Sequence, residues 1–110
     1  MAARATAALA AANELLLVDL VVAECVYVLE SFYEVRRERI AELMRAAVAL
    51  PSVRTIDSPT LLRALEVYEV DRLDFAEAYL VAQAETTGVG AALSFDKSID
   101  LVGTIERQEP

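Results

Sequence analysis

Short apolar runs alternate with segments of helical pattern along most of the chain. Residues 15–18 and 91–95 are apolar runs of strand length, and residues 53–57 alternate between apolar and polar positions as a strand does. Residues 19–33 and 36–50 lie between these runs and are predicted helices, the second with a clear apolar stripe. Helices that alternate with short strands predict an α/β sandwich built on a short, mainly parallel sheet.

The other segments in the first part of the chain fit this alternation. Residues 2–13 are mostly Ala, the best helix former, and predict a first helix. Asp19 is the predicted N-cap of the helix that follows the first strand. Ser58 is the predicted N-cap of a later helix, which Pro59 opens.

The last third of the chain predicts one more helix between two strands. Asp74 and Glu77 have the spacing of a capping box, ahead of a helix that stops near Gly88. Residues 101–106 are predicted to be a last short strand. Because no linker or repeat divides the chain, we expect residues 1–110 to form a single domain.

Composition limits the class of protein. The hydrophobic fraction is 56%, above the usual range for a soluble domain, so we expect a homodimer or a complex to cover apolar surface. The net charge of -8 argues against binding of nucleic acid through a broad basic surface. A nuclease is still possible, because a metal held by carboxylates supplies local positive charge and Arg36, Arg37 and Arg39 form one basic cluster.

The sequence also predicts where the protein works. The longest apolar run, residues 15–29, is interrupted by Asp19 and Glu24 and is too short to span a bilayer. Cys25 is the one cysteine, so no internal disulfide can form and a reducing compartment is expected. We therefore expect a cytoplasmic protein with no membrane association.

Glu24 stands in the middle of the apolar segment 20–29. In a helix its neighbours one turn away are all apolar, so no cation of the same helix can pair with it. Three environments satisfy such a carboxylate: water at the rim of the helix, an arginine from elsewhere in the fold, or a metal ion. A metal ion is favoured by two further acidic pairs that stand beside apolar segments, Asp74 with Glu77 and Asp96 with Asp100.

The chemistry of the candidate site follows from the residue types available. The chain has no His, so imidazole is excluded as a base or a ligand, and oxygen ligands point to Mg²⁺ or Mn²⁺. Asp96 follows a predicted strand, and ligands of parallel α/β sheets bind at the carboxyl ends of strands. Each acid also has a structural alternative, a capping box for Asp74 with Glu77 and a turn with Lys97 for Asp96.

Three of these segments, in this order and spacing, resemble the PIN-domain ribonucleases, and most closely the VapC-type toxins of toxin–antitoxin pairs. They are the apolar helix with Ala23-Glu24, the Leu-Asp-Phe-Ala-Glu-Ala segment at residues 73–78 and the Leu-Ser-Phe-Asp-Lys segment at residues 93–97. The resemblance covers nearly the whole chain, although each motif alone is short. It implies a three-layer sandwich and cleavage of RNA by hydrolysis that depends on Mg²⁺ or Mn²⁺.

The resemblance also assigns residues and partners. It implies that Glu24, Glu77 and Asp96 are the catalytic residues and the metal ligands, direct or through water. It gives a supporting place to three further residues: Asp74, Ser94 and Asp100. An antitoxin protein is the implied partner, and RNA is the implied substrate.

Two departures from the family pattern modify these expectations. Position 77 holds Glu where the family usually has Asp, which displaces a ligand by about an ångström. The family's first strand, which ends in an Asp and lies at the centre of the sheet, has no counterpart here. We therefore expect an amino-terminally truncated PIN-like domain with impaired ribonuclease activity and weak metal binding. The alternative is a catalytically inactive module that dimerises or binds an antitoxin, and a response-regulator-like acidic pocket fits less well because no Asp ends an early strand.

Overall fold

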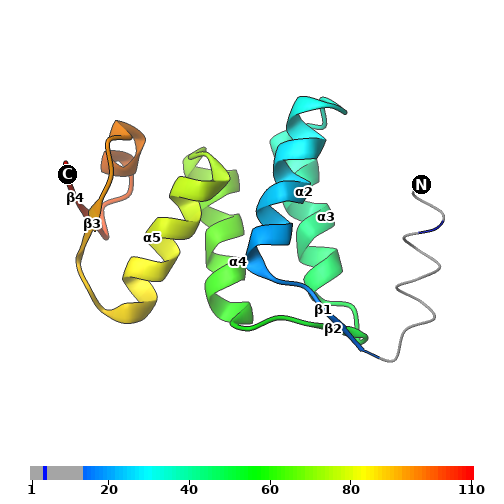
Figure 1. Ribbon diagram of the computed structural model, residues 1–110. Coiled ribbons are helices and arrows are strands. Elements are labelled where there is room, and N and C mark those ends of the chain that lie inside the picture. Colours follow the sequence, from blue (N-terminus) through cyan, green and yellow to red (C-terminus); the bar gives the residue numbers. More distant parts are fainter. Residues whose placement is uncertain (1–3, 5–13) are drawn as a thin grey trace.

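The computed structural model describes Arg4 and residues 14–110, and Figure 1 shows how their elements are arranged. The helix predicted over residues 2–13 lies outside the described residues. In chain order the elements are β1 (Leu15–Leu16), α2 (Asp19–Ser31), α3 (Arg37–Val48), β2 (Val53–Arg54), α4 (Ser58–Glu66), the π-helix η1 (Val67–Asp71), α5 (Phe75–Thr87), β3 (Ala91–Leu93), the 3-10 helix η2 (Lys97–Leu101) and β4 (Glu106–Gln108).

The strands pair in parallel but form two separate sheets. Strand β1 pairs with β2, and β3 pairs with β4, each in a two-stranded parallel ladder. The predicted α/β class with parallel strands is thus confirmed, whereas the expected single sheet is divided. Figure 1 shows why, since the helices α4 and α5 lie between the two ladders. The helices follow the predicted alternation, and their packing keeps the two strand pairs apart.

The core lies where α3, α4 and α5 meet. Helix α4 has the strongest separation of apolar and polar faces, and its Leu61 and Leu65 are fully buried against α5, which contributes Val81. Ile40 of α3 closes the same core. Full burial of a Leu or Ile side chain stabilises the fold by about 1.5–3 kcal/mol. This helical core therefore holds α5, and with it the first turn of α5, in place.

Helix α2 covers one side of this core with a narrow face. Only Val22 and Val26 of α2 are buried, while Leu20 is 77% exposed and Tyr27 is also exposed. The continuous apolar character of this segment therefore does not mean continuous burial. None of the helices within Arg4 and residues 14–110 is long and apolar enough to cross a membrane.

Two of the predicted helix caps are wrong. The N-cap of α4 is Asp57 and not Ser58, because the Asp57 carboxylate accepts hydrogen bonds from the Thr60 amide at 3.2 Å and the Thr60 hydroxyl at 2.6 Å. The N-cap of α2 is Val18, without a side-chain cap, and Asp19 is instead the first helical residue. The Asp19 carboxylate is used elsewhere, as acceptor from the Tyr79 hydroxyl of α5.

Two predictions near the carboxyl end are also wrong. Asp74 is the N-cap residue of α5, but its side chain makes no capping hydrogen bond, so the predicted capping box with Glu77 does not form. The strand expected at residues 101–106 is largely replaced by the end of η2 and a turn, and pairing begins only at Glu106. Asp96 caps η2 by accepting from the Ser98 amide, which favours a helical turn over a strand here.

Candidate functional site

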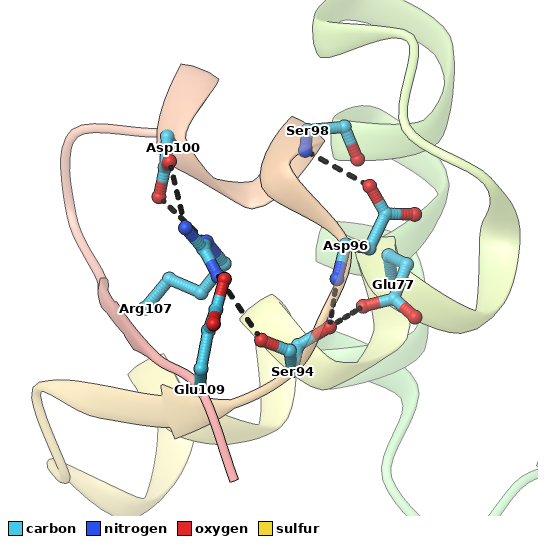
Figure 2. Close-up of polar contacts among 7 residues, drawn as sticks. All are labelled: Glu77, Ser94, Asp96, Ser98, Asp100, Arg107 and Glu109. Atoms are coloured by element: carbon cyan, nitrogen blue, oxygen red, sulfur yellow. Dashed lines mark hydrogen bonds and ion pairs between the residues drawn. The ribbon is translucent and has the colours of Figure 1, made fainter.

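Ser94 lies at the centre of the candidate site, directly after β3. Its amide donates to the Gln108 carbonyl at 3.0 Å, which extends the ladder with β4 by one bond. Its hydroxyl donates to Glu77 Oε2 at 3.0 Å and accepts from the Asp96 amide, also at 3.0 Å. Figure 2 shows how this one side chain joins Glu77 of α5 to Asp96. Two of the three predicted catalytic residues therefore meet at Ser94.

Asp96 is fixed by its position ahead of η2. Its Oδ1 accepts from the Ser98 amide at 2.9 Å. Hydrogen bonding from Ser98, with a smaller contribution from the positive charge of Arg107, lowers the pKa of Asp96 below its ordinary value. Asp96 is thus a carboxylate at neutral pH, and the Ser98 bond engages one of its two oxygens.

Arg107 of β4 is a cation that contacts this arrangement, through the Ser94 carbonyl. Its guanidinium donates from Nε and Nη2 to the two carboxylate oxygens of Asp100, at 3.1 and 3.4 Å. Its Nη1 donates to the Ser94 carbonyl at 3.2 Å and to Glu109, also at 3.2 Å. The side chain is only 13% exposed. Asp100, a predicted supporting residue, is therefore held by Arg107.

The residues around Ser94 fit a hard divalent cation in part. Glu77 and Asp96 supply carboxylate oxygens and Ser94 a hydroxyl, which is the ligand chemistry that Mg²⁺ and Mn²⁺ prefer. Mg²⁺ is commonly held by one or two protein carboxylates, with water and substrate phosphate completing its shell. Among Arg4 and residues 14–110, however, no three acidic or thiol side chains gather closely enough to hold a metal ion. The described site offers a pair of carboxylates.

Glu24 does not join this pair. It is exposed on α2, in agreement with the alternative in which its carboxylate lies in water at the rim of the helix. Figure 1 places α2 and β3 on opposite sides of α4 and α5. Asp74 also lies elsewhere, at a cavity of about 290 Å³ whose other walls include Tyr27 and Glu30 of α2. The catalytic and metal-binding roles of Glu24, Glu77 and Asp96 stay predictions.

The arginines of the predicted basic cluster make hydrogen bonds and ion pairs within the fold. Arg37 Nη1 donates to the Tyr68 carbonyl at 2.7 Å and the Leu73 carbonyl at 2.6 Å, and its guanidinium lies 4.3 Å from the centre of the Tyr68 ring. Arg39 pairs with Glu42, and Arg36 lies 4.0 Å from a carboxylate oxygen of Glu38. Arg37 therefore connects α3 to the backbone of Tyr68 and Leu73, whereas Arg39 and Arg36 pair with nearby carboxylates. These contacts lie away from the Ser94 site.

Sequence reasoning missed two groups of residues. Arg107 lies just beyond the strand predicted at residues 101–106. Because that strand was placed too early in the chain, the position of Arg107 in β4 was not predicted. The second group links α2 to α5: Gln83 donates to the Tyr79 hydroxyl at 2.7 Å, and Tyr79 donates to Asp19. Burial, followed by the hydrogen bond to Asp19, raises the pKa of Tyr79. The spacing of Tyr79 and Gln83 by one helical turn was the available signal for this group.

Comparison with known proteins identifies a family for this chain. The family model described as PIN domain matches residues 1–104. No curated protein matches the chain significantly, and neither does any solved structure. The matched span includes α2, the first turn of α5 and the Ser94 segment.

Proposed function

Since the chain belongs to the PIN-domain family, we propose that it is a metal-dependent endoribonuclease, and that its biological role is that of the toxin in a toxin–antitoxin pair. PIN domains are in general nuclease domains that bind divalent metal ions. The observation that carries the proposal for this chain is the meeting of Glu77 and Asp96 at the Ser94 hydroxyl. The finding that no described helix can span a membrane is compatible with a cytoplasmic site of action.

Each residue of the Ser94 site has a part in the proposed reaction. Glu77 and Asp96 would hold Mg²⁺ or Mn²⁺, and the Ser94 hydroxyl bonds the Glu77 carboxylate and the Asp96 backbone amide. The bound cation would neutralise charge on the scissile phosphate and lower the pKa of a water molecule. The exposed Lys97 directly follows Asp96 and is suited to contact an RNA phosphate in an otherwise acidic chain.

The same arrangement leads us to expect a slow enzyme. Two carboxylates make a weaker cation site than three or four do, because less negative charge is gathered on the ion. Glu77 also carries one methylene more than Asp, and a misplacement of about 1 Å can reduce a rate on the order of 100-fold. We therefore propose weak binding of Mg²⁺ and slow cleavage of RNA.

A cleavage assay on a labelled single-stranded RNA tests this function. We expect slow cleavage that needs Mg²⁺ or Mn²⁺ and stops with EDTA, and a loss on the order of 100-fold in Glu77→Gln or Asp96→Asn. Glu42→Gln, which removes an exposed carboxylate of α3, is the matched control and should keep full activity. Metal-dependent cleavage that survives both site variants would refute the assignment, and Glu24→Gln tests the role of Glu24 separately.

A second candidate function is supported by exposed apolar side chains. Leu16 of β1 and Leu20 of α2 are 65% and 77% exposed, and Ile56, which lines a cavity together with Leu20, is 77% exposed. Large exposed apolar groups of this kind mark surfaces that bind other proteins. The second candidate is therefore an interaction module that forms a homodimer or binds an antitoxin. Absence of any metal-dependent cleavage, together with stable self-association, would favour this module over the nuclease.

A further inference from the structure

Arg107 connects three separate segments around the Ser94 site. It belongs to β4, where it pairs in register with Ala92 of β3. From there its guanidinium reaches forward to the Ser94 carbonyl and across to both oxygens of Asp100 in η2. Figure 2 shows these bonds on the side of the Ser94 backbone away from Glu77. Arg107 itself has no hydrogen bond to Glu77 or Asp96 among those of the described residues.

The bond to the Ser94 carbonyl has a consequence for the Ser94 hydroxyl. Carbonyl and hydroxyl belong to one residue, so a fixed carbonyl restricts the backbone that carries the hydroxyl between Glu77 and Asp96. The bidentate pairing of Arg107 with Asp100 restrains η2 as well, and η2 begins directly after Asp96. A planar, bidentate ion pair of this kind is specific to Arg, because the ammonium group of Lys is a point charge and cannot donate along two parallel directions.

We propose that Arg107 is a positioning residue of the candidate site, and that Asp100 acts through Arg107 and not as a metal ligand. Removal of outer partners of this kind typically weakens metal binding by about 10–100-fold. The opposite role is that of a competitor, in which Arg107 merely neutralises Asp100 and repels a cation. The two roles differ in sign, because loss of a competitor would raise the affinity for a metal ion. The metal-binding part of this proposal rests on the proposed nuclease function, whereas the positioning part does not.

Amide hydrogen exchange and Mn²⁺ binding, measured on the whole chain, test the proposal together. The variant is Arg107→Lys, which keeps the positive charge but removes the bidentate pairing with Asp100. Arg54→Lys is the matched control, since Arg54 is also a strand arginine paired with a carboxylate, that of Glu14, in the other sheet. The exchange probes are the Asp96 and Ser98 amides, which donate to Ser94 and Asp96, with Val81 of the core as the reference for global stability.

We expect Arg107→Lys to speed exchange at Asp96 and Ser98 at least about tenfold and to weaken Mn²⁺ binding about tenfold, with Val81 and Arg54→Lys unchanged. Unchanged exchange at Asp96 and Ser98, or stronger Mn²⁺ binding, would overturn the positioning role. Faster exchange in a chain that binds no Mn²⁺ even as wild type would support the positioning role and count against the nuclease instead.

Asp100→Asn separates positioning from ligation. We expect it to weaken Mn²⁺ binding no more than Arg107→Lys does, and the double variant to add little, because both changes break one connected pair. Loss of Mn²⁺ binding in Asp100→Asn with normal exchange at Asp96 and Ser98 would identify Asp100 as a direct ligand and overturn its assignment.

Discussion

The Ser94 hydroxyl donates a 3.0 Å hydrogen bond to the Glu77 carboxylate, across a sequence separation of 17 residues. This bond joins the first turn of α5 to the segment that follows β3. A carboxylate in the first turn of a helix also interacts favourably with the helix dipole. The candidate site therefore depends on the packing of α5 against the β3–β4 ladder.

Ser94→Ala should disconnect the Glu77 carboxylate from the Asp96 backbone. The change removes the donor to Glu77 and the acceptor for the Asp96 amide, so we expect a fall in RNA cleavage of about tenfold and a loss of about 1 kcal/mol in unfolding free energy. Cleavage kinetics and urea unfolding measure the two effects. Ser94→Thr keeps the hydroxyl and should retain most activity, whereas Ser31→Ala at the exposed end of α2 is the neutral control. Full activity in Ser94→Ala would mean that Ser94 does not organise the site.

Arg37→Met should destabilise the whole domain. Arg37 binds the Tyr68 and Leu73 carbonyls, and its loss leaves both without this charged donor and removes the contact with the Tyr68 ring. We expect the unfolding free energy to fall by about 1.5–3 kcal/mol, the range for hydrogen bonds to charged groups. Arg36→Met, at a neighbouring side chain that is 89% exposed, should change it by less than about 0.5 kcal/mol. Equal effects in urea unfolding would contradict the structural role of Arg37.

The Arg63–Glu85 pair predicts a dependence of stability on pH. Arg63 Nε donates to Glu85 Oε1 at 2.7 Å, and this bond lowers the pKa of Glu85 below its ordinary value of 4.5. Because the folded pKa is the lower one, the ionised carboxylate stabilises the fold above the unfolded pKa, and this contribution is lost as the pH falls through the folded pKa. Glu85→Gln should cost about 0.5–1 kcal/mol at neutral pH and nothing below the folded pKa, as measured by denaturant unfolding over a pH series. A cost that persists in acid would exclude the charge as its cause.

Within Arg4 and residues 14–110, strand β1 pairs only with β2, and its other edge predicts a homodimer. Leu15 and Leu17 donate to carbonyls of the β2 side at 2.7 and 2.8 Å, so the amide and carbonyl of Leu16 between them face away from β2. An unpaired edge beside exposed apolar side chains favours association with another strand. Sedimentation at micromolar concentration should give a mass near twice the 12.0 kDa of one chain. Leu16→Lys should shift this equilibrium to the monomer, while Leu101→Lys, at an exposed leucine of η2, should not.

The periodic features of the sequence predicted the helices well. Residues 36–50 were expected to form a helix, and α3 spans Arg37–Val48. The predicted stop near Gly88 is confirmed, since Gly88 ends α5 with a φ of 77°, a conformation that glycine adopts without strain. Periodicity is a local property, and helical hydrogen bonds are local too, so the sequence carries this information directly.

The contacts between distant segments were not predictable in the same way. Whether two strand pairs share one sheet depends on how helices pack, and no local pattern encodes it. Asp57 and Ser58 are both good N-caps, and their one-residue difference is decided by the Thr60 contacts. The apolar neighbours of Glu24 suggested burial, but most of them are exposed, and so is Glu24 itself. Glu77 and Asp96 could be predicted as candidates, whereas Arg107 required the observed register of β4.

The position of a bound Mn²⁺ tests the central claim most directly, that Glu77 and Asp96 form the metal site at Ser94. Paramagnetic Mn²⁺, added in substoichiometric amounts, broadens the amide NMR signals of residues close to the ion. The account predicts selective broadening at Ser94, Asp96 and Ser98, little effect at the Glu24 amide, and loss of this pattern in Glu77→Gln. Broadening centred on Glu24, or a pattern that Glu77→Gln leaves unchanged, would contradict it.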